Sequence, residues 1–186
     1  DGDLLLVDAG AEFDYYNADL TRTLPINGKF SPTQRHLYEL VLTAQKAAIE
    51  KVKPGTHFNE IHDTALKILT EGLLDLGLLE GNLEELLEKE GYKKFYMHKT
   101  SHWLGMDVHD MGKYRLKQDW RPLQPGMVLT VEPGLYFGAH LSPEISSEFH
   151  NIGIRIEDDV LVTEEGHHVL TSAAPKEIED IETLMS

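Results

Sequence analysis

Strand-like and helix-like patterns occupy separate stretches of this sequence instead of alternating along it. Residues 4–7 form an apolar run typical of a strand, and a strand pattern resumes over residues 13–24 after a short polar break, which predicts a β-hairpin. Apolar residues at helical spacing fill the middle of the chain, and strands and turns return from residue 92 onward. This segregation predicts an α+β fold with a largely antiparallel sheet.

Local signals mark the two main helices of the middle stretch. Ser31, Pro32 and Gln34 form a helix start, with Ser31 as the N-cap, Pro32 at the first helical position and Gln34 placed to complete a capping box. A second helix is predicted from about residue 59 to residue 76, with Gly77 as its cap.

The composition excludes several classes of function. Seventeen Lys and Arg against 32 Asp and Glu give a net charge of −15, so the chain lacks the basic footprint of a nucleic-acid-binding protein, and anionic membrane surfaces would repel it. A cationic partner, such as a metal ion or a peptide amino terminus, suits this charge better.

There are no cysteines, which excludes disulfides and thiolate metal sites and favours a reducing compartment, so we expect a cytoplasmic protein.

Asp8 interrupts the first apolar run at a point where a core residue would be expected. A buried carboxylate needs a partner. If the hairpin turns at residues 13–14, Asp8 lies directly across from Asp19, with Cβ atoms about 4.5–5.5 Å apart. Two facing carboxylates destabilise a sheet unless a cation lies between them. The alternative is a solvated hairpin surface that holds no ligand.

Three histidines, His98, His102 and His109, lie within twelve residues of one another. Imidazole serves both as a metal ligand and as a proton carrier near neutral pH. Gly105 permits a tight bend that could aim separate histidines at one cavity. Because a single buried, hydrogen-bonded histidine is common, we expect about one of the three to be purely structural.

Two further segments place charged residues at strand positions. Glu132 ends the predicted strand 128–131 just before a Pro-Gly break, where a carboxylate would be held rigidly while facing a cavity. In the segment that follows Gly153, strict alternation puts Arg155 and Glu157 on one face of a strand. The alternative for this pair is an exposed ion pair on an edge strand.

Together, four carboxylates and one histidine make a hard, oxygen-rich ligand set, which suits two divalent ions such as manganese. Four carboxylates and two divalent ions also roughly cancel in charge. Two metals about 3.5–4 Å apart can share a hydroxide, which gives a nucleophile at neutral pH and a Lewis acid for a carbonyl oxygen. The sequence therefore predicts amide hydrolysis without a serine or cysteine nucleophile.

The motifs VDAG, ADLTRT, SHWLGMDVHD, GMVLTVEPGLY and NIGIRIEDDVLVT follow one another through almost the whole chain. This ordered set resembles the pita-bread metallopeptidases, and among them the aminopeptidase P, or Xaa-Pro aminopeptidase, family. The resemblance implies two divalent ions, preferably Mn²⁺, with ligands Asp8, Asp19, His102, Glu132 and Glu157. In this family pattern Asp19 and Glu157 bridge the ions, Asp8 completes one site, and His102 with Glu132 completes the other.

The resemblance also implies roles in catalysis. Glu132 would act as general base and proton carrier. His98 and His109 would line the substrate pocket and steady the tetrahedral intermediate. Arg155 would help to hold the bridging carboxylates and the substrate.

The implied activity is hydrolysis, by a metal-bridging hydroxide, of the bond between an N-terminal residue and a following proline. The implied partners are peptides with proline at the second position, and we expect a homo-oligomer. Residues 1–186 would form the C-terminal catalytic, pita-bread domain, incomplete on its N-terminal side. Lys99 and Thr100 replace a Gly-Leu pair of some family members, which affects local pocket shape.

Two alternatives remain open. A prolidase shares the fold and cleaves only Xaa-Pro dipeptides, although the Ser-His-Trp-Leu-Gly form looks more like aminopeptidase P. A catalytically silent pita-bread module would bind peptides without cleaving them, but retention of all five ligand positions argues against it.

Overall fold

The computed structural model describes residues 2–138 and 145–185 of the chain. Its strands are β1 (Leu4–Ala9), β2 (Glu12–Phe13), β3 (Tyr16–Asn17), β4 (Leu20–Pro25), β5 (Arg115–Leu116), β6 (Asp119–Trp120), β7 (Val128–Val131), β8 (Gly134–Phe137), β9 (Ile152–Arg155), β10 (Asp158–Val162) and β11 (His167–Val169). Its helices are α1 (Pro32–Ile49), α2 (Phe58–Asp75), α3 (Leu83–Glu88) and α4 (Ile178–Met185), with single 3₁₀ turns at Gly91–Lys94 and Ser147–Phe149. Every strand pair within the described residues is antiparallel, which confirms the predicted α+β class.

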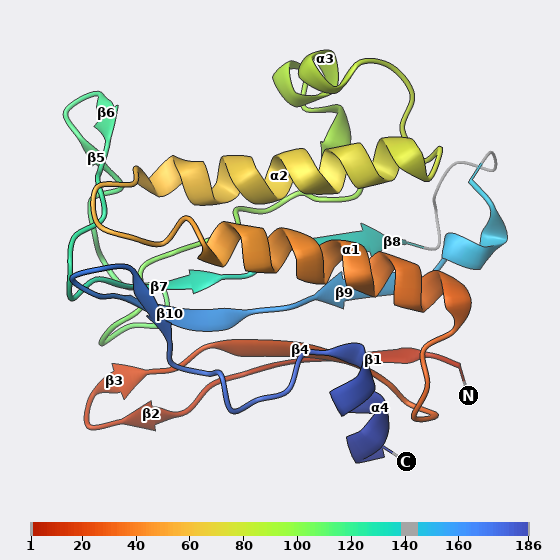
Figure 1. Ribbon diagram of the computed structural model, residues 1–186, viewed down its shortest axis with the longest axis horizontal. Coiled ribbons are helices and arrows are strands. Elements are labelled where there is room, and N and C mark those ends of the chain that lie inside the picture. The colour runs from red at the N-terminus through yellow and green to blue at the C-terminus, as the bar shows by residue number, and fades with distance from the viewer. Residues whose placement is uncertain (1, 139–144, 186) are drawn as a thin grey trace.

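Helices α1 and α2 run side by side and lie on one side of the strands β7, β8 and β9 (Figure 1). The β1–β4 hairpin contacts β9 and lies farther from these helices. The stripe Leu37, Val41, Ala44 and Ala48 on α1 is fully buried against the strands. Burial of Leu37 and of Val41 stabilises the fold by roughly 1.5–3 kcal/mol each, and the small Ala44 and Ala48 let the helix pack closely, so the helical layer supports the sheet that carries the site.

The predicted helix ends are confirmed. The Ser31 hydroxyl accepts the backbone N–H of Gln34 at 3.2 Å, and the Gln34 side chain accepts the N–H of Ser31 at 2.9 Å, which completes a capping box. Leu76 is the C-cap of α2, and Gly77 follows it with a φ of 68°, a left-handed conformation that glycine adopts without a steric penalty. None of the helices within residues 2–138 and 145–185 combines the length and apolar character needed to cross a membrane.

The predicted register of the first hairpin is wrong. Asp8 pairs with Thr21, not with Asp19. The hairpin turns at Asp14 and Tyr15, both at positive φ (49° and 64°), one residue later than predicted. A turn moved by one residue shifts the pairing by two, and because side chains alternate between faces, Asp19 stays on the face of Asp8 but diagonal to it.

Gly10 allows the two sides of this hairpin to approach each other closely. A Cβ atom at this position would lie 1.7 Å from the carbonyl oxygen of Ala18. Any other residue would therefore push the segment before Asp19 away from β1.

Candidate metal centre

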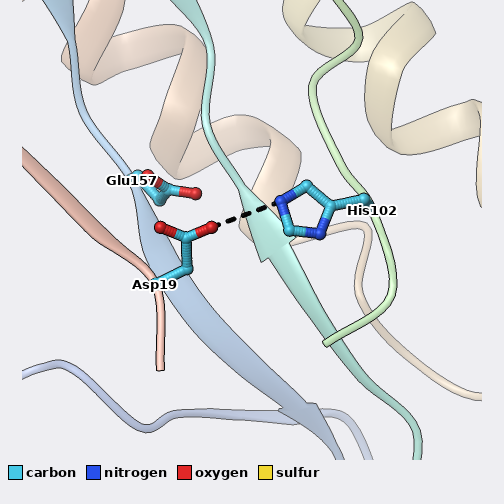
Figure 2. Close-up of side chains that lie close together, drawn as sticks. All are labelled: Asp19, His102 and Glu157. Carbon is cyan, nitrogen blue, oxygen red and sulfur yellow. Dashed lines mark ion pairs between the residues drawn. The ribbon is translucent and has the colours of Figure 1, made fainter. Parts of the chain in front are cut away.

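Side chains from three distant parts of the chain converge at one point. Asp19 directly precedes β4, His102 lies in the segment before β5, and Glu157 lies between β9 and β10. Their ligand atoms all lie within 4.8 Å of one another, and Figure 2 shows the His102 ring directed at the Asp19 carboxylate. His102 Nε2 is 3.4 Å from Asp19 Oδ2. Two carboxylates and an imidazole at this spacing form a set that a divalent ion can bind.

The backbone fixes the orientation of the His102 ring. Its Nδ1 lies 3.0 Å from the carbonyl oxygen of Trp103, and since a carbonyl only accepts, Nδ1 carries the proton. Nε2 therefore presents its lone pair to the acidic group. Metal-binding histidines use this arrangement to set the tautomer and ring direction.

Glu132, which follows β7, is the fourth group at this point. Its Oε1 lies 3.5 Å from His102 Nε2, and its backbone N–H donates to the carbonyl of Thr100 at 2.8 Å. Burial raises the pKa of Glu132 to about 7, against the lowering effect of Arg155 and with a further contribution from the charge of Asp19. The main cause is desolvation, which penalises the charged form of this carboxyl and which a bound cation would offset.

Glu157 is almost completely buried and is held by Thr21. Its backbone N–H donates to the Thr21 carbonyl at 3.1 Å, and its carboxylate accepts the Thr21 hydroxyl at 2.5 Å. Burial, and then the charge of Glu132, raise the pKa of Glu157 to about 8. Burial, and then Asp8, also raise the pKa of Asp19. Close, buried carboxyl groups repel one another in their charged forms, and a cation bound among them would favour those charged forms.

Asp8 lies at the margin of this group. Its side chain is 48% exposed and pairs with the Arg155 guanidinium, and it is outside the compact set of Asp19, His102 and Glu157. It nevertheless interacts with the Asp19 carboxyl. The family pattern gave Asp8 the role of completing one site, and in the structure its side chain is far more exposed than those of Asp19, Glu132 and Glu157.

Arg155 links several parts of the site. Its Nε donates to the Thr21 hydroxyl at 3.1 Å, one terminal nitrogen donates to the Tyr136 hydroxyl at 3.0 Å, and the other donates to Asp8. Arg155 and Glu157 therefore face the same way, as the alternation predicted. The alternative of an exposed edge pair is wrong, because the Arg155 side chain is 17% exposed and Glu157 only 2%.

His98 joins this network through Tyr136. His98 Nδ1 lies 2.8 Å from the carbonyl of Lys99 and so carries the proton, which leaves Nε2 to accept the Tyr136 hydroxyl at 2.7 Å. Burial lowers the pKa of His98, which favours its neutral form. The guanidinium of Arg155, the Tyr136 hydroxyl and the imidazole of His98 thus form one chain of hydrogen bonds.

His109 contacts the site from an exposed loop. Its ring packs edge-on against His102, with ring centroids 4.4 Å apart and an interplanar angle of 76°. Both rings line a hollow beside the acidic group. His109 is therefore placed next to the candidate ligands and open to an incoming molecule.

The sequence reasoning missed Thr21 and Tyr136. Both are uncharged, so neither stood out in a search for ligands and proton carriers. Strand alternation gave a usable signal, because Thr21 lies two residues after Asp19 and Tyr136 four residues after Glu132.

Residues 1–164 match the model of metallopeptidase family M24, and the chain belongs to this family. The α+β arrangement is its pita-bread fold. Among curated proteins, the chain is 52% identical over 186 residues to the Xaa-Pro aminopeptidase of Haemophilus influenzae and 46% identical over 185 residues to that of Escherichia coli. The solved structure of Pseudomonas aeruginosa aminopeptidase PepP matches with a TM-score of 0.95 at 53% identity. The resemblance to the aminopeptidase P family is confirmed.

The relatives are considerably longer than this chain. The matches to the H. influenzae and E. coli proteins cover 100% of the chain but only 43% and 41% of those proteins, and the P. aeruginosa structure is covered to 42%. The chain thus spans about two fifths of the length of these relatives.

Proposed function

We propose that residues 1–186 belong to the catalytic, pita-bread domain of an aminopeptidase that hydrolyses the bond between an N-terminal residue and a following proline. The observation that carries the proposal is the convergence of Asp19, His102 and Glu157 within 4.8 Å, with Glu132 beside them, in a metallopeptidase of family M24. The similarity to proteins named Xaa-Pro aminopeptidase supports the choice of substrate.

The metal ligands in this proposal are Asp8, Asp19, His102, Glu132 and Glu157. The donor set fits a pair of divalent ions, since it offers hard oxygen atoms and one oriented imidazole, and its buried carboxyls repel one another without a cation. We favour Mn²⁺ for the same reason. When bound, such ions supply a Lewis acid for the scissile carbonyl and lower the pKa of a water molecule, so that it attacks near neutral pH.

The remaining steps fall to side chains around the acidic group. Glu132 would accept a proton from the attacking water and return it to the proline nitrogen that leaves. His98 and His109 would line the substrate pocket and steady the tetrahedral intermediate, with His109 as the hydrogen-bond donor to the developing oxyanion. Arg155, held in place by Thr21, Tyr136 and Asp8, would keep the carboxylates in the positions needed to bind the ions.

The test consists of two measurements, metal analysis and a peptidase assay, on the natural full-length protein purified without chelator. We expect about two divalent ions per chain and manganese-dependent cleavage of a tripeptide such as Ala-Pro-Ala. Asp19→Ala should lose both, whereas Asp180→Ala, on α4, should keep both. A protein without manganese, cobalt, iron or zinc at useful occupancy would count heavily against the proposal.

Substrate length separates the remaining alternatives. An aminopeptidase P cleaves both tripeptides and longer Xaa-Pro peptides, whereas a prolidase would accept only the dipeptide Ala-Pro. Binding of peptides without cleavage, even with added metal, would favour a silent module. The cytoplasmic location and homo-oligomeric state remain expectations from the sequence.

A further inference from the structure

A hollow of about 790 Å³ opens beside the candidate metal centre and shares His102 and His109 with it. Its other walls come from the start of α2, the segment around Lys99, and the β5–β6 hairpin. A hollow of this size is large enough for a ligand of several residues. None of the roles proposed above for the acidic group uses this space.

Aromatic side chains form a rigid wall of the hollow. The ring centroid of Phe58 lies 4.8 Å from that of Tyr114 and 4.6 Å from that of Trp103, while Trp103 and Tyr114 stack at an interplanar angle of 12°. Phe58 and Tyr114 line the hollow, and the buried Trp103 packs against both of them without lining it, so the wall is already shaped before a ligand arrives. Preformed apolar walls of this kind accept side chains at little entropic cost.

The charges at the hollow are mainly cationic, against the chain's net charge of −15. The Arg115 guanidinium lies 4.1 Å from the ring centroid of Trp120 and donates to the carbonyl of Gln118, which fixes its position. Neither Lys99 nor Arg115 forms an ion pair with a carboxylate in the part of the chain that the structure describes. Lys113 and Arg121 line an adjoining hollow that also reaches His109, and one carboxylate, Asp110, lies with them there.

The remaining titratable groups do not offset these cations. Asp63 is the one carboxylate among the described lining residues, and it accepts a hydrogen bond from the Asn59 amide at 2.7 Å. The Nδ1 of His62 lies 2.8 Å from the Thr100 hydroxyl, and burial, followed by Lys99, lowers the pKa of His62 to about 4. His62 is therefore neutral at neutral pH and adds no charge of its own.

The sign of the charge decides which end of a peptide fits. The amino terminus of a substrate is positively charged and would be repelled by Lys99 and Arg115. The part of the peptide downstream of the proline carries the C-terminal carboxylate and any acidic side chains, and these complement the two cations. We propose that this hollow, which we call the basic subsite, binds the residues after the proline and selects peptides with a carboxylate there. The proposal rests on the proposed aminopeptidase function.

The test compares matched peptides on the natural full-length protein. Ala-Pro-Glu-Ala-amide against Ala-Pro-Gln-Ala-amide measures selection of an acidic side chain, and Ala-Pro-Ala against its amide measures selection of the terminal carboxylate. We expect about a 3- to 10-fold higher kcat/KM for at least one acidic member, mainly through KM, and a decline of this ratio with added salt.

Two variants test whether the preference for acidic peptides arises from the basic subsite. The double variant Lys99→Gln with Arg115→Gln should bring the acidic-to-neutral ratio close to one at normal metal content. The control Lys67→Gln removes an exposed lysine that lies on α2 and does not line the hollow, and should keep the ratio of the unmodified protein.

The outcomes distinguish the two proposals. Cleavage of all the peptides without a charge preference, or with a preference that survives in the double variant, would overturn the basic subsite and leave the aminopeptidase function standing. If no Xaa-Pro peptide is cleaved by metal-loaded protein, the aminopeptidase function fails and the subsite falls with it.

Discussion

The backbone N–H of Asn17 donates to the carbonyl oxygen of Gly105 at 2.8 Å, and the Asn17 side-chain amide donates to the carbonyl of Met106 at 2.6 Å. Asn17 lies two residues before Asp19, and Gly105 lies three residues after His102. These bonds therefore tie together the two segments that carry a candidate carboxylate ligand and the candidate imidazole ligand.

The first prediction concerns this tie. Asn17→Ala removes the side-chain bonds to the carbonyls of Gly105 and Met106 and keeps the backbone bond, so the site should assemble but hold metal less firmly. We expect about a 10-fold loss of Mn²⁺ affinity, the lower end of the range for groups that orient ligands, measured by titration calorimetry. Asn27→Ala, in an exposed turn, is the control and should bind as the unmodified protein does. Equal affinity in both variants would show that the side-chain bonds are dispensable.

The second prediction ranks the carboxylates. Asp19→Ala and Glu157→Ala should lower metal content more than Asp8→Ala, because Asp19 and Glu157 lie in the compact set and Asp8 is half-exposed and paired with Arg155. Elemental analysis of the three purified variants measures the order. If Asp8→Ala alone lost all metal while the other two variants retained it, the assignment of bridging ligands would be wrong.

The third prediction separates His109 from the ligands. Its ring contacts His102 and faces the hollow, so His109→Ala should lower turnover by on the order of 100-fold, the typical effect of removing a donor to an oxyanion. Metal content should stay near that of the unmodified full-length protein. Loss of metal in this variant would instead place His109 among the ligands.

The fourth prediction follows from the raised pKa of Glu157, about 8 against an ordinary value of 4.5. A carboxyl group whose pKa is raised by folding stabilises the folded state fully below its unfolded pKa, and this contribution is lost as the pH rises through the folded value. Chelator-treated protein should therefore show a Tm that falls between about pH 4.5 and pH 8, and added Mn²⁺ should raise the Tm most at the upper end.

Two variants control the pH experiment. Glu157→Gln should make the decline in Tm smaller but not abolish it, because it removes one titrating carboxyl from the buried site and leaves Glu132 and Asp19, whose pKa values are also raised. Glu164→Gln, at an exposed position, should leave the profile unchanged. A Tm of the metal-free protein that rises across this pH range would contradict the assigned shift.

Local parts of the fold were predictable because their causes are local. The capping box of Ser31 and Gln34 and the left-handed Gly77 depend on residues a few positions apart. The hairpin register was not predictable in the same way. Its turn places Tyr15 at positive φ, a conformation that is uncommon for residues other than glycine, so the residue type gave no sign that the turn lies there.

The candidate site, like the fold, could be predicted only in part. Charged and imidazole groups could be selected from residue type and spacing, and the family pattern supplied their expected roles. The pairing of Arg155 with Asp8, and the bond from Tyr136 to His98, depend on strands that meet only in three dimensions. The hollow next to His102 also forms between distant segments, and therefore could not be predicted from sequence spacing.

The last prediction concerns Arg22, whose buried guanidinium joins three segments behind the site. It donates to the carbonyls of Thr21 and Glu157, to those of Ala174 and Pro175, and to the Asp158 carboxylate at 2.8 Å. The Asp158 side chain is fully buried, and although burial alone would raise its pKa, Arg22 and then Lys176 hold the pKa below its ordinary value.

Arg22→Leu leaves this carboxylate with Lys176 as its remaining cation and several carbonyls without donors, so we expect a loss of about 3–5 kcal/mol in the free energy of unfolding. Arg35→Leu is the matched control, because Arg35 pairs with Glu179 and Glu182 at the surface, where solvent screens such pairs. Urea unfolding followed by circular dichroism compares the two variants. Equal midpoints would show that the buried pair contributes no more than the surface one, and the Asp158 carboxylate would then need another source of stabilisation.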